Sequence, residues 1–481
     1  MAEKRNMILW AVLIGMLMSA VDTTIVILAL PTITDKLKAP FLDTIWVILI
    51  YLLVLAALTT QLGRLGDIYG RGRIFNLGFL IFIVGSALSG AATSVDFLIG
   101  ARGLQGFGAV LIQANSGAIV ADYFPVRERG RAFGITSMGW TIGGTLGIVL
   151  GGIITSLTTW RFIFYINVPI GLIGFYLALK YIKDNQEEKV KMDYSGTGLL
   201  LVLLVLISYG AVEIAGNGVS ALNLAMLVAG IVLIIPFLVV EKVVKSPMLI
   251  LRAFKEKMLS YSLLSATLQA IGYLSVLFIL IMYLQGVRGY SPLDSALLLV
   301  PGYIVSSLLS PRMGRLSDKI SPGYVASTGI FLMAIGVLIY YSMGVATPIY
   351  IVVVGSLATG IGGSFFWPSN SSAVMTAAPR DLLGSVSGLQ RTLSNIGTLM
   401  SYVIAISIAA LSVPRNVAFE VFLGVDKLQG GVSAKFMVGI HSALLVSFII
   451  LIFGALSSLA TGKMRRFNPH TPDKVSEPEK V

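Results

Sequence analysis

Long apolar runs recur along the whole sequence, each roughly 20 residues long and separated by short charged or Gly/Pro-rich segments. A run of this length crosses a bilayer as an α-helix, whereas a membrane β-strand would alternate apolar and polar residues. The chain is 56% hydrophobic and 12% charged, while a soluble domain carries about 25% charged residues. We therefore expect an all-α, multi-pass protein of the cytoplasmic membrane.

The apolar runs predict fourteen transmembrane helices, with each boundary uncertain by about four residues. An even number of spans places both termini on one side. If that side is cytoplasmic, it holds most of the 35 Lys and Arg residues, as the positive-inside rule requires. The basic excess is therefore topological and does not indicate nucleic-acid binding. The expected spans are 7–31, 43–62, 74–93, 96–121, 132–156, 161–182, 196–216, 221–241, 259–285, 292–313, 323–344, 347–370, 385–411 and 436–461.

Two short segments recur in the second half of the chain in the same order. GRLGD at 63–67 returns as GRLSD at 314–318, and ANSGAIV at 114–120 returns as SNSSAVM at 369–375. The nearly constant offset indicates a parallel repeat of six helices, with two further helices inserted between the copies. The expected domains are an N-terminal six-helix bundle (1–190), an inserted two-helix linker with its loop (191–258), a C-terminal six-helix bundle (259–461) and a disordered tail (462–481).

Five segments carry a family resemblance that extends over essentially the whole chain. The segments are VDTTIVILALP (21–31), GRLGDIYGRGR (63–73), LIGARGLQGFGA (98–109), GGTLGIVLGG (143–152) and WRFIFYINVPIG (160–171). Together they resemble the major facilitator superfamily, and within it the fourteen-helix drug:proton antiporter branch.

The resemblance implies a major facilitator fold and a secondary active transporter with both termini in the cytoplasm. Such a protein would export lipophilic or cationic small molecules by proton antiport through alternating access. It would be a monomer in the lipid bilayer, with the proton as coupling ion and no other cofactor. Ile148 stands where the antiporter motif of this branch has proline. Uniport or symport of a metabolite or lipid without antiport therefore stays open as the alternative.

Asp22 is the only charged residue between Met7 and Leu30. A carboxylate at mid-bilayer costs about 2.5–3.5 kcal/mol on insertion scales, so Asp22 should face the bundle interior. Arg102, in the fourth predicted helix, is its candidate partner. A carboxylate that alternates between an unpaired and a guanidinium-paired environment can take up and release a proton. The alternative is that Asp22 only accepts hydrogen bonds and never titrates.

Several other residues are candidates for proton coupling or substrate contact. Acids near helix ends commonly cap helices, and aromatic residues in a bundle commonly only pack, although they also attract cations through their ring faces. The candidates are Glu213, Asp294, Arg391, Trp140, Phe366, Trp367 and Asn370.

Charged residues on the expected cytoplasmic side could form a gating latch. Opposite charges there can hold that face closed in one state and separate in the other, as an alternating-access protein needs. The alternative is that these loop charges only fix the topology. The proposed latch residues are Gly63, Asp67, Gly70, Arg71, Asp122 and Asp318.

A glycine recurs every four residues in the fifth predicted helix, at Gly139, Gly143, Gly147 and Gly151. Such a stripe lets two helices approach closely, and we expect it to pack against a helix of the second half. The sequence has no GxxxxGK[ST] loop for an ATPase, and its two histidines and absent cysteines predict no metal site. We therefore expect no enzymatic activity.

Overall fold

The computed structural model describes residues 2–183, 192–244, 247–248, 253–378, 383–411 and 432–463. Within these ranges the regular elements are helices, so the expected all-α class is confirmed. Thirteen described helical spans are long and apolar enough to cross a membrane, and the apolar part of α5, Ile142–Leu157, adds a fourteenth. The proposed disordered tail lies outside the described residues from position 464 onward.

Each of the fourteen predicted spans lies on a helical segment of the structure, and three of these spans are divided. Several helices extend more than four residues beyond the predicted bounds, for example to 69 in place of 62 and to 377 in place of 370. The bounds are α1 Ala2–Leu37, α2 Phe41–Tyr69, α3 Arg71–Ala91, α4 Val95–Tyr123, α5 Val126–Leu157, α6 Phe162–Tyr165, α7 Asn167–Tyr181, α8 Tyr194–Asn217, α9 Ala221–Val232, α10 Ile234–Val243, η1 Ala253–Lys255, α11 Lys257–Tyr273, α12 Val276–Ile281, the π-helical η2 Met282–Val287, α13 Pro292–Lys319, α14 Pro322–Tyr341, α15 Tyr350–Ala377, α16 Leu383–Leu411 and α18 Val432–Lys463.

Two of the divisions have the same cause. The helix α6 ends at Tyr165, four residues before Pro169, and α9 ends at Val232, four residues before Pro236. A proline has no N–H to donate to the carbonyl four residues earlier, so the helical ladder is interrupted there. The third division lies between α11 and α12, where the N–H of Ser275 donates to Ser401 Oγ of α16 at 3.0 Å.

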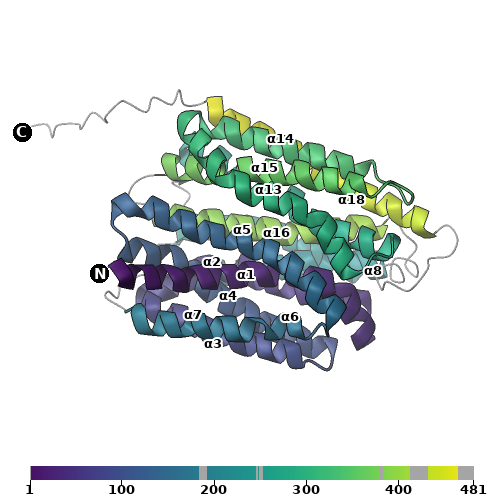
Figure 1. Cartoon of the computed structure of the whole chain (residues 1–481), viewed down its shortest axis with the longest axis horizontal. Helices are drawn as coiled ribbons and strands as arrows, with labels where there is room; N and C mark the ends of the chain where they lie inside the picture. The colour runs from purple at the N-terminus through teal and green to yellow at the C-terminus, as the bar shows by residue number, and fades with distance from the viewer. Residues whose placement is uncertain are drawn as a thin grey trace, which may run out of the picture.

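The helices form two groups that lie side by side. In Figure 1, α1 to α7 occupy the lower part of the view, and α13, α14, α15 and α18 occupy the upper part. Within the groups, α1 packs on α5, α3 on α4, and α14 on both α15 and α18. The start of α1 and the end of α18 lie at the same end of the bundle (Figure 1). We call this end the termini face and the opposite end the far face.

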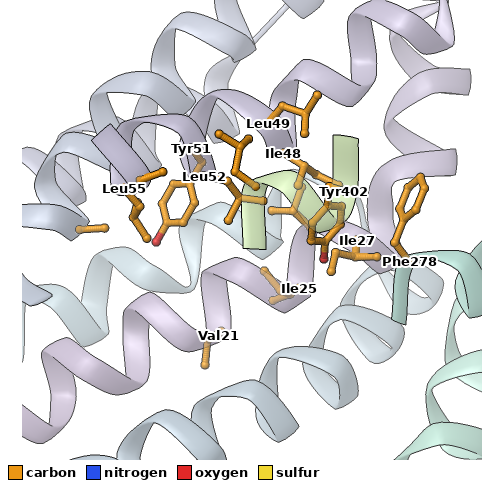
Figure 2. Close-up of a cluster of buried hydrophobic side chains, with 14 of the residues drawn as sticks. Val21, Ile25, Ile27, Ile48, Leu49, Tyr51, Leu52, Leu55, Phe278 and Tyr402 are labelled. Atoms are coloured by element: carbon orange, nitrogen blue, oxygen red, sulfur yellow. The ribbon is translucent and has the colours of Figure 1, made fainter. Parts of the chain in front are cut away.

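An apolar cluster joins the two groups near the middle of the bundle. Figure 2 shows Ile27 of α1 and Ile48 of α2 beside Phe278 of α12 and Tyr402 of α16. The rings of Phe278 and Tyr402 have centroids 5.8 Å apart. Because lipid tails are as apolar as these side chains, close packing and not exclusion of water stabilises such contacts in a membrane.

The glycine stripe of α5 packs against α1, so the expectation of a partner in the second half was wrong. A Cβ at Gly143 would lie 2.6 Å from the carbonyl oxygen of Leu17, and one at Gly139 would lie 2.6 Å from Leu13 Cδ1. Periodicity identifies the smooth face of a helix but not the helix that covers it. The face that meets the second half is one residue further round, where a Cβ at Gly152 would lie 2.8 Å from Ala296 Cβ of α13. Gly147 and Gly151 likewise face α1.

Candidate functional site

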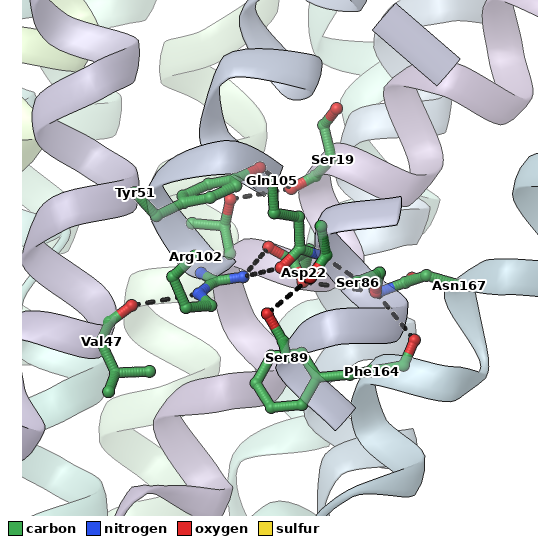
Figure 3. Close-up of polar contacts among 12 residues, drawn as sticks. Ser19, Asp22, Val47, Tyr51, Ser86, Ser89, Arg102, Gln105, Phe164 and Asn167 are labelled. Atoms are coloured by element: carbon green, nitrogen blue, oxygen red, sulfur yellow. Dashed lines mark hydrogen bonds and ion pairs between the residues drawn. The ribbon is translucent and has the colours of Figure 1, made fainter. Parts of the chain in front are cut away.

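Asp22 lies on α1 with none of its surface exposed, and it forms an ion pair with Arg102 of α4 (Figure 3). Arg102 Nη1 donates to Asp22 Oδ2 at 2.5 Å, and the arginine is itself 1% exposed. Both charges face the interior of the bundle because neither is tolerated against lipid. The structure thus brings together the acid and base that the sequence indicated as partners.

Gln105 connects the two charged groups. It lies three residues after Arg102, so the two side chains share one face of α4. Its Oε1 accepts a hydrogen bond from Arg102 Nη1 at 2.7 Å, and its Nε2 donates to Asp22 Oδ1 at 2.8 Å. One amide therefore bonds to both members of the ion pair. Sequence reasoning missed Gln105, although the position stands in the quoted segment LIGARGLQGFGA.

Two further polar residues complete the surroundings of Asp22. Asn167, at the start of α7, has Nδ2 3.4 Å from Asp22 Oδ1 and 3.2 Å from Ser86 Oγ of α3. Ser86 in turn donates to the carbonyl oxygen of Phe164 at 2.8 Å. Sequence reasoning missed Ser86 and Asn167 too, because single polar residues in apolar runs carry no distinguishing signal.

Arg102 has partners besides the carboxylate. Its Nε donates to the carbonyl oxygen of Val47 at 3.1 Å, and its guanidinium carbon lies 4.3 Å from the centroid of the Tyr51 ring. A guanidinium that stacks on an aromatic face and donates in several directions is well stabilised away from water. These contacts do not depend on Asp22, so Arg102 keeps them if the carboxylate becomes neutral.

Glu213 and Asp294 do not join this cluster. Glu213 Oε2 accepts a hydrogen bond from Asn217 Nδ2 at 2.7 Å, one turn later at the end of α8. Asp294 lies in the first turn of α13, where its N–H donates to Ser291 Oγ at 3.1 Å and its Oδ2 accepts from the same hydroxyl at 2.7 Å. Ser291 is therefore the N-cap of α13, and Asp294 accepts a hydrogen bond from the capping hydroxyl.

Arg391 lies on a polar face of α16 that bridges to the first group of helices. Its Nη1 donates to the carbonyl oxygen of Gln113 on α4. Nearby, the hydroxyls of Thr60 and Thr392 are 2.6 Å apart, and Asn395 Nδ2 donates to Thr59 Oγ1 at 3.0 Å. The helix α16 packs on α11 and α18, whereas α2 and α4 belong to the first group. These bonds therefore join the two groups in the half of the bundle nearer the termini face.

The aromatic candidates are separate from the Asp22 cluster. Phe366 is fully buried beside Trp367 on α15, with ring centroids 5.3 Å apart. Trp367 and Trp140 are each 37% exposed. Asn370 is 1% exposed and its Nδ2 has no hydrogen-bond partner among the described residues.

The latch charges meet at the termini face. Arg71 pairs with Asp67 at 2.7 Å and with Asp122 at 2.6 Å, which ties the end of α2 and the end of α4 to the start of α3. Gly70 is the single residue between α2 and α3. Its φ of 99° is a backbone conformation that favours glycine. A Cβ at Gly63 would find only ordinary contacts with Ala114. The side chain of Asp318 lies outside the described residues.

A bundle of fourteen membrane helices that surrounds a buried ion pair has the construction of a membrane transporter. The chain belongs to the Major Facilitator Superfamily, whose family model matches residues 12–402. The superfamily expected from the motifs is confirmed. The protein is therefore a multi-pass transporter of the cell membrane that carries small molecules, and it is not an enzyme.

Among the named relatives, a multidrug resistance protein supports the multidrug efflux branch within this superfamily, and another relative is a riboflavin transporter. The multidrug resistance protein Stp of Mycobacterium tuberculosis (strain CDC 1551 / Oshkosh) is 30% identical over 403 residues, which are 82% of this chain and 74% of that protein. The riboflavin transporter RibZ of Clostridioides difficile (strain 630) is 28% identical over 425 residues, which are 87% of this chain and 91% of that protein.

Solved structures show the same fold. A bacterial homologue of the human lysosomal transporter Spinster, in an inward-facing and unoccupied conformation, superposes with a TM-score of 0.67. The alignment covers 96% of this chain and 97% of that one at 16% sequence identity. At this identity the likeness concerns the fold alone.

Proposed function

We propose that this transporter exports lipophilic or cationic small molecules in exchange for protons, and that Asp22 carries the proton. The observation on which the proposal rests is the buried cluster of Asp22, Arg102 and Gln105. In it a carboxylate with no exposed surface is held by a guanidinium at 2.5 Å and an amide at 2.8 Å. An intramembrane acid in such a place typically marks a proton or ion pathway.

The network suits a group that changes its charge. When a proton binds the Asp22 carboxylate, the attraction to Arg102 is lost, and an unpaired buried cation would be costly. Arg102 then retains Gln105 Oε1, the carbonyl oxygen of Val47 and the Tyr51 ring. Because these contacts limit the cost of the protonated state, both charge states of Asp22 are accessible within one bundle.

In this proposal both chain termini are cytoplasmic, and the bundles 1–190 and 259–461 rock about the site as rigid bodies. The contacts of Arg71 with Asp67 and Asp122 hold the termini face of the first bundle together in one state. Trp140, Phe366, Trp367 and Asn370 are the proposed contacts for a lipophilic cation. The substrate class is supported by the name of the relative Stp, a multidrug resistance protein.

The test is uptake of ethidium, a lipophilic cation, into everted membrane vesicles under an imposed proton gradient. We expect Asp22→Asn to abolish gradient-driven uptake while the protein still inserts and folds. The matched control is Asp35→Asn on the same helix, because the Asp35 side chain is 64% exposed and forms an ion pair with its neighbour Lys36. Undiminished gradient-driven uptake by Asp22→Asn would remove Asp22 from the mechanism.

Transport of a metabolite or lipid without antiport is the second candidate function. Two observations favour it, namely the relative RibZ, which is a riboflavin transporter, and the buried Ile148 at the motif position of proline. Riboflavin flux into proteoliposomes separates the two candidates. Flux that follows the riboflavin gradient and ignores an imposed pH jump would favour this second candidate over antiport.

A further inference from the structure

The inserted helices α8 to α10 cover the line along which α2 and α16 meet. The helix α8 packs on both α2 and α16, while α9 packs on α8 and α10. On one side the rings of Tyr209 and Trp46 of α2 have centroids 5.9 Å apart. On the other side Ser407 Oγ of α16 donates to the carbonyl oxygen of Ala211 at 3.3 Å. We call α8 to α10 the inserted pair, because α9 and α10 together form one span. The inserted pair therefore contacts both halves of the transporter.

At the termini face the inserted pair carries two buried carboxylates, Asp193 just before α8 and Glu241 on α10. Each is only 1% exposed. Both converge on Gly196, where an added Cβ would lie 2.7 Å from Glu241 Oε1 and closer still to Asp193 Oδ2. Two carboxylates this close and this deeply buried repel each other, so they require compensation from a nearby positive charge.

The compensating charge comes from α2. Arg64 is half-buried and interacts electrostatically with Asp193 and Glu241. Its Nη2 also donates to the carbonyl oxygen of Pro247, beyond α10, at 2.5 Å. One turn earlier, Gln61 Oε1 accepts a hydrogen bond from the N–H of Asp193 at 3.3 Å. The last turns of α2 thus hold the start of α8 and the end of α10.

Arg64 stands inside GRLGD, three residues before Asp67. It interacts electrostatically with Asp67 as well, and Asp67 pairs with Arg71. The charges of the inserted pair are therefore continuous with the latch of the first bundle.

The contact between α8 and α16 has a different character. The helix α16 has one charged residue, Arg391, and its guanidinium bonds to Gln113 of α4. The contact described above between Ser407 and a backbone carbonyl is an uncharged hydrogen bond. Small sliding movements of packed helices are a common form of conformational change, and a contact between uncharged groups opposes such sliding less than a buried charge cluster does.

We propose that Asp193 and Glu241 are positioning residues that act through Arg64. They fix the inserted pair to the latch end of α2, so that α8, α10 and α2 move as one body while α16 slides along α8 during transport. The inserted pair then provides the surface along which α16 moves relative to α2. It is more than a covalent connection between the two bundles. This proposal depends on alternating access and not on which ion or substrate is carried.

Cross-linking tests which half the pair follows, because a chain without cysteine allows each introduced pair to be unique. Leu42→Cys with Gly216→Cys joins α2 to α8, where a Cβ at position 216 would lie 2.6 Å from Leu42 Cγ. Ala211→Cys with Ser407→Cys joins α8 to α16 through a short bis-methanethiosulfonate reagent, which forms a disulfide with each cysteine and is released by reduction. We expect the first link to leave ethidium efflux intact and the second to abolish it until the link is cleaved.

Two other outcomes would overturn the proposal. Loss of efflux on linking α2 to α8, with efflux retained on linking α8 to α16, would mean that the pair follows the second bundle. Efflux retained with both links would mean that α16 does not slide along α8.

A second measurement follows the distances between α2, α8 and α14 directly and does not depend on a transport assay. Tyr69, Tyr194 and Tyr324 are exposed residues on α2, α8 and α14, and cysteines there accept spin labels. With and without ethidium, and at acidic and alkaline pH, we expect the 194–324 distance to change together with the 69–324 distance. The 69–194 distance should stay constant.

The role of the carboxylates is tested in the same labelled chain. In Asp193→Asn with Glu241→Gln, we expect the 69–194 distance distribution to broaden, because Arg64 no longer holds the pair. The matched variant Glu213→Gln changes an acid on α8 outside this cluster and should keep the narrow distribution. An unchanged 69–194 distribution in the double variant would show that Asp193 and Glu241 do not position the pair.

Discussion

Gln105 Oε1 accepts a hydrogen bond from Arg102 Nη1 at 2.7 Å, one turn along the same helix. The same amide donates to Asp22 through Nε2, so its two ends fix the separation of the two charges. Glutamine is suited to this place because its side chain has one acceptor and one donor group that point apart.

The first prediction concerns this amide. Gln105→Leu removes a donor to Asp22 and an acceptor from Arg102, and hydrogen bonds to charged groups contribute about 1.5–3 kcal/mol each. We expect a lower midpoint of thermal unfolding in detergent and weaker proton-linked transport. Gln105→Glu should impair transport more, because it adds a second acid beside Asp22. Equal transport in the wild type and both variants would contradict this role.

The second prediction concerns Arg102. Arg102→Ala leaves Asp22 buried without its counter-ion, which costs about 3–5 kcal/mol in comparable buried pairs. Arg102→Lys keeps the charge but replaces the separate Nε and Nη1, which reach the carbonyl oxygen of Val47 and Asp22, with one nitrogen. We expect thermal stability to fall in the order wild type, lysine, alanine.

A double variant checks that the stability loss comes from the ion pair. Asp22→Asn combined with Arg102→Ala removes both charges, so it should be more stable than Arg102→Ala alone. If the losses of the two single variants simply add in the double variant, the pair is not coupled.

The third prediction separates gating from stability at the termini face. The side chains of Arg71 and Asp67 are half-buried, at 27% and 24% exposed, and ion pairs that water still reaches contribute about 0–1 kcal/mol. Asp67→Asn should therefore change the unfolding midpoint little and still reduce the transport rate. A large loss of thermal stability with a normal rate per folded molecule would assign Asp67 to folding instead.

The fourth prediction uses two neighbouring glycines of α5. A Cβ at Gly147 would collide with Thr24 and lie 2.6 Å from the carbonyl oxygen of Val21, whereas a Cβ at Gly144 would have nothing within 4 Å. Gly147→Ala should push α5 away from α1 and cost about 1–3 kcal/mol. Gly144→Ala is the matched control and should be neutral or slightly stabilising. Similar unfolding midpoints for the two variants would contradict the packing of α1 on α5.

Much of the fold was predictable because membrane helices must be long and apolar. All fourteen spans could be located from the apolar runs, and the charge of Asp22 pointed to the interior because lipid does not tolerate it. The partner of the stripe at Gly143 could not be predicted, since a periodic face is equally smooth to any neighbouring helix. Ser86 and Asn167 were missed for a related reason, because their role depends on which helices meet around Asp22.

The interruption between α6 and α7 has a consequence for Asp22. Phe164, before the interruption, supplies the carbonyl oxygen that holds Ser86, and Asn167, after it, points its amide at both Ser86 and Asp22. Pro169 causes the interruption without touching the acid through any of these bonds. In the proposed function, the place of the Asn167 amide sets part of the affinity of the Asp22 carboxylate for its proton. Related transporters could therefore differ in that affinity through this backbone position alone, while every polar residue around the acid stays the same.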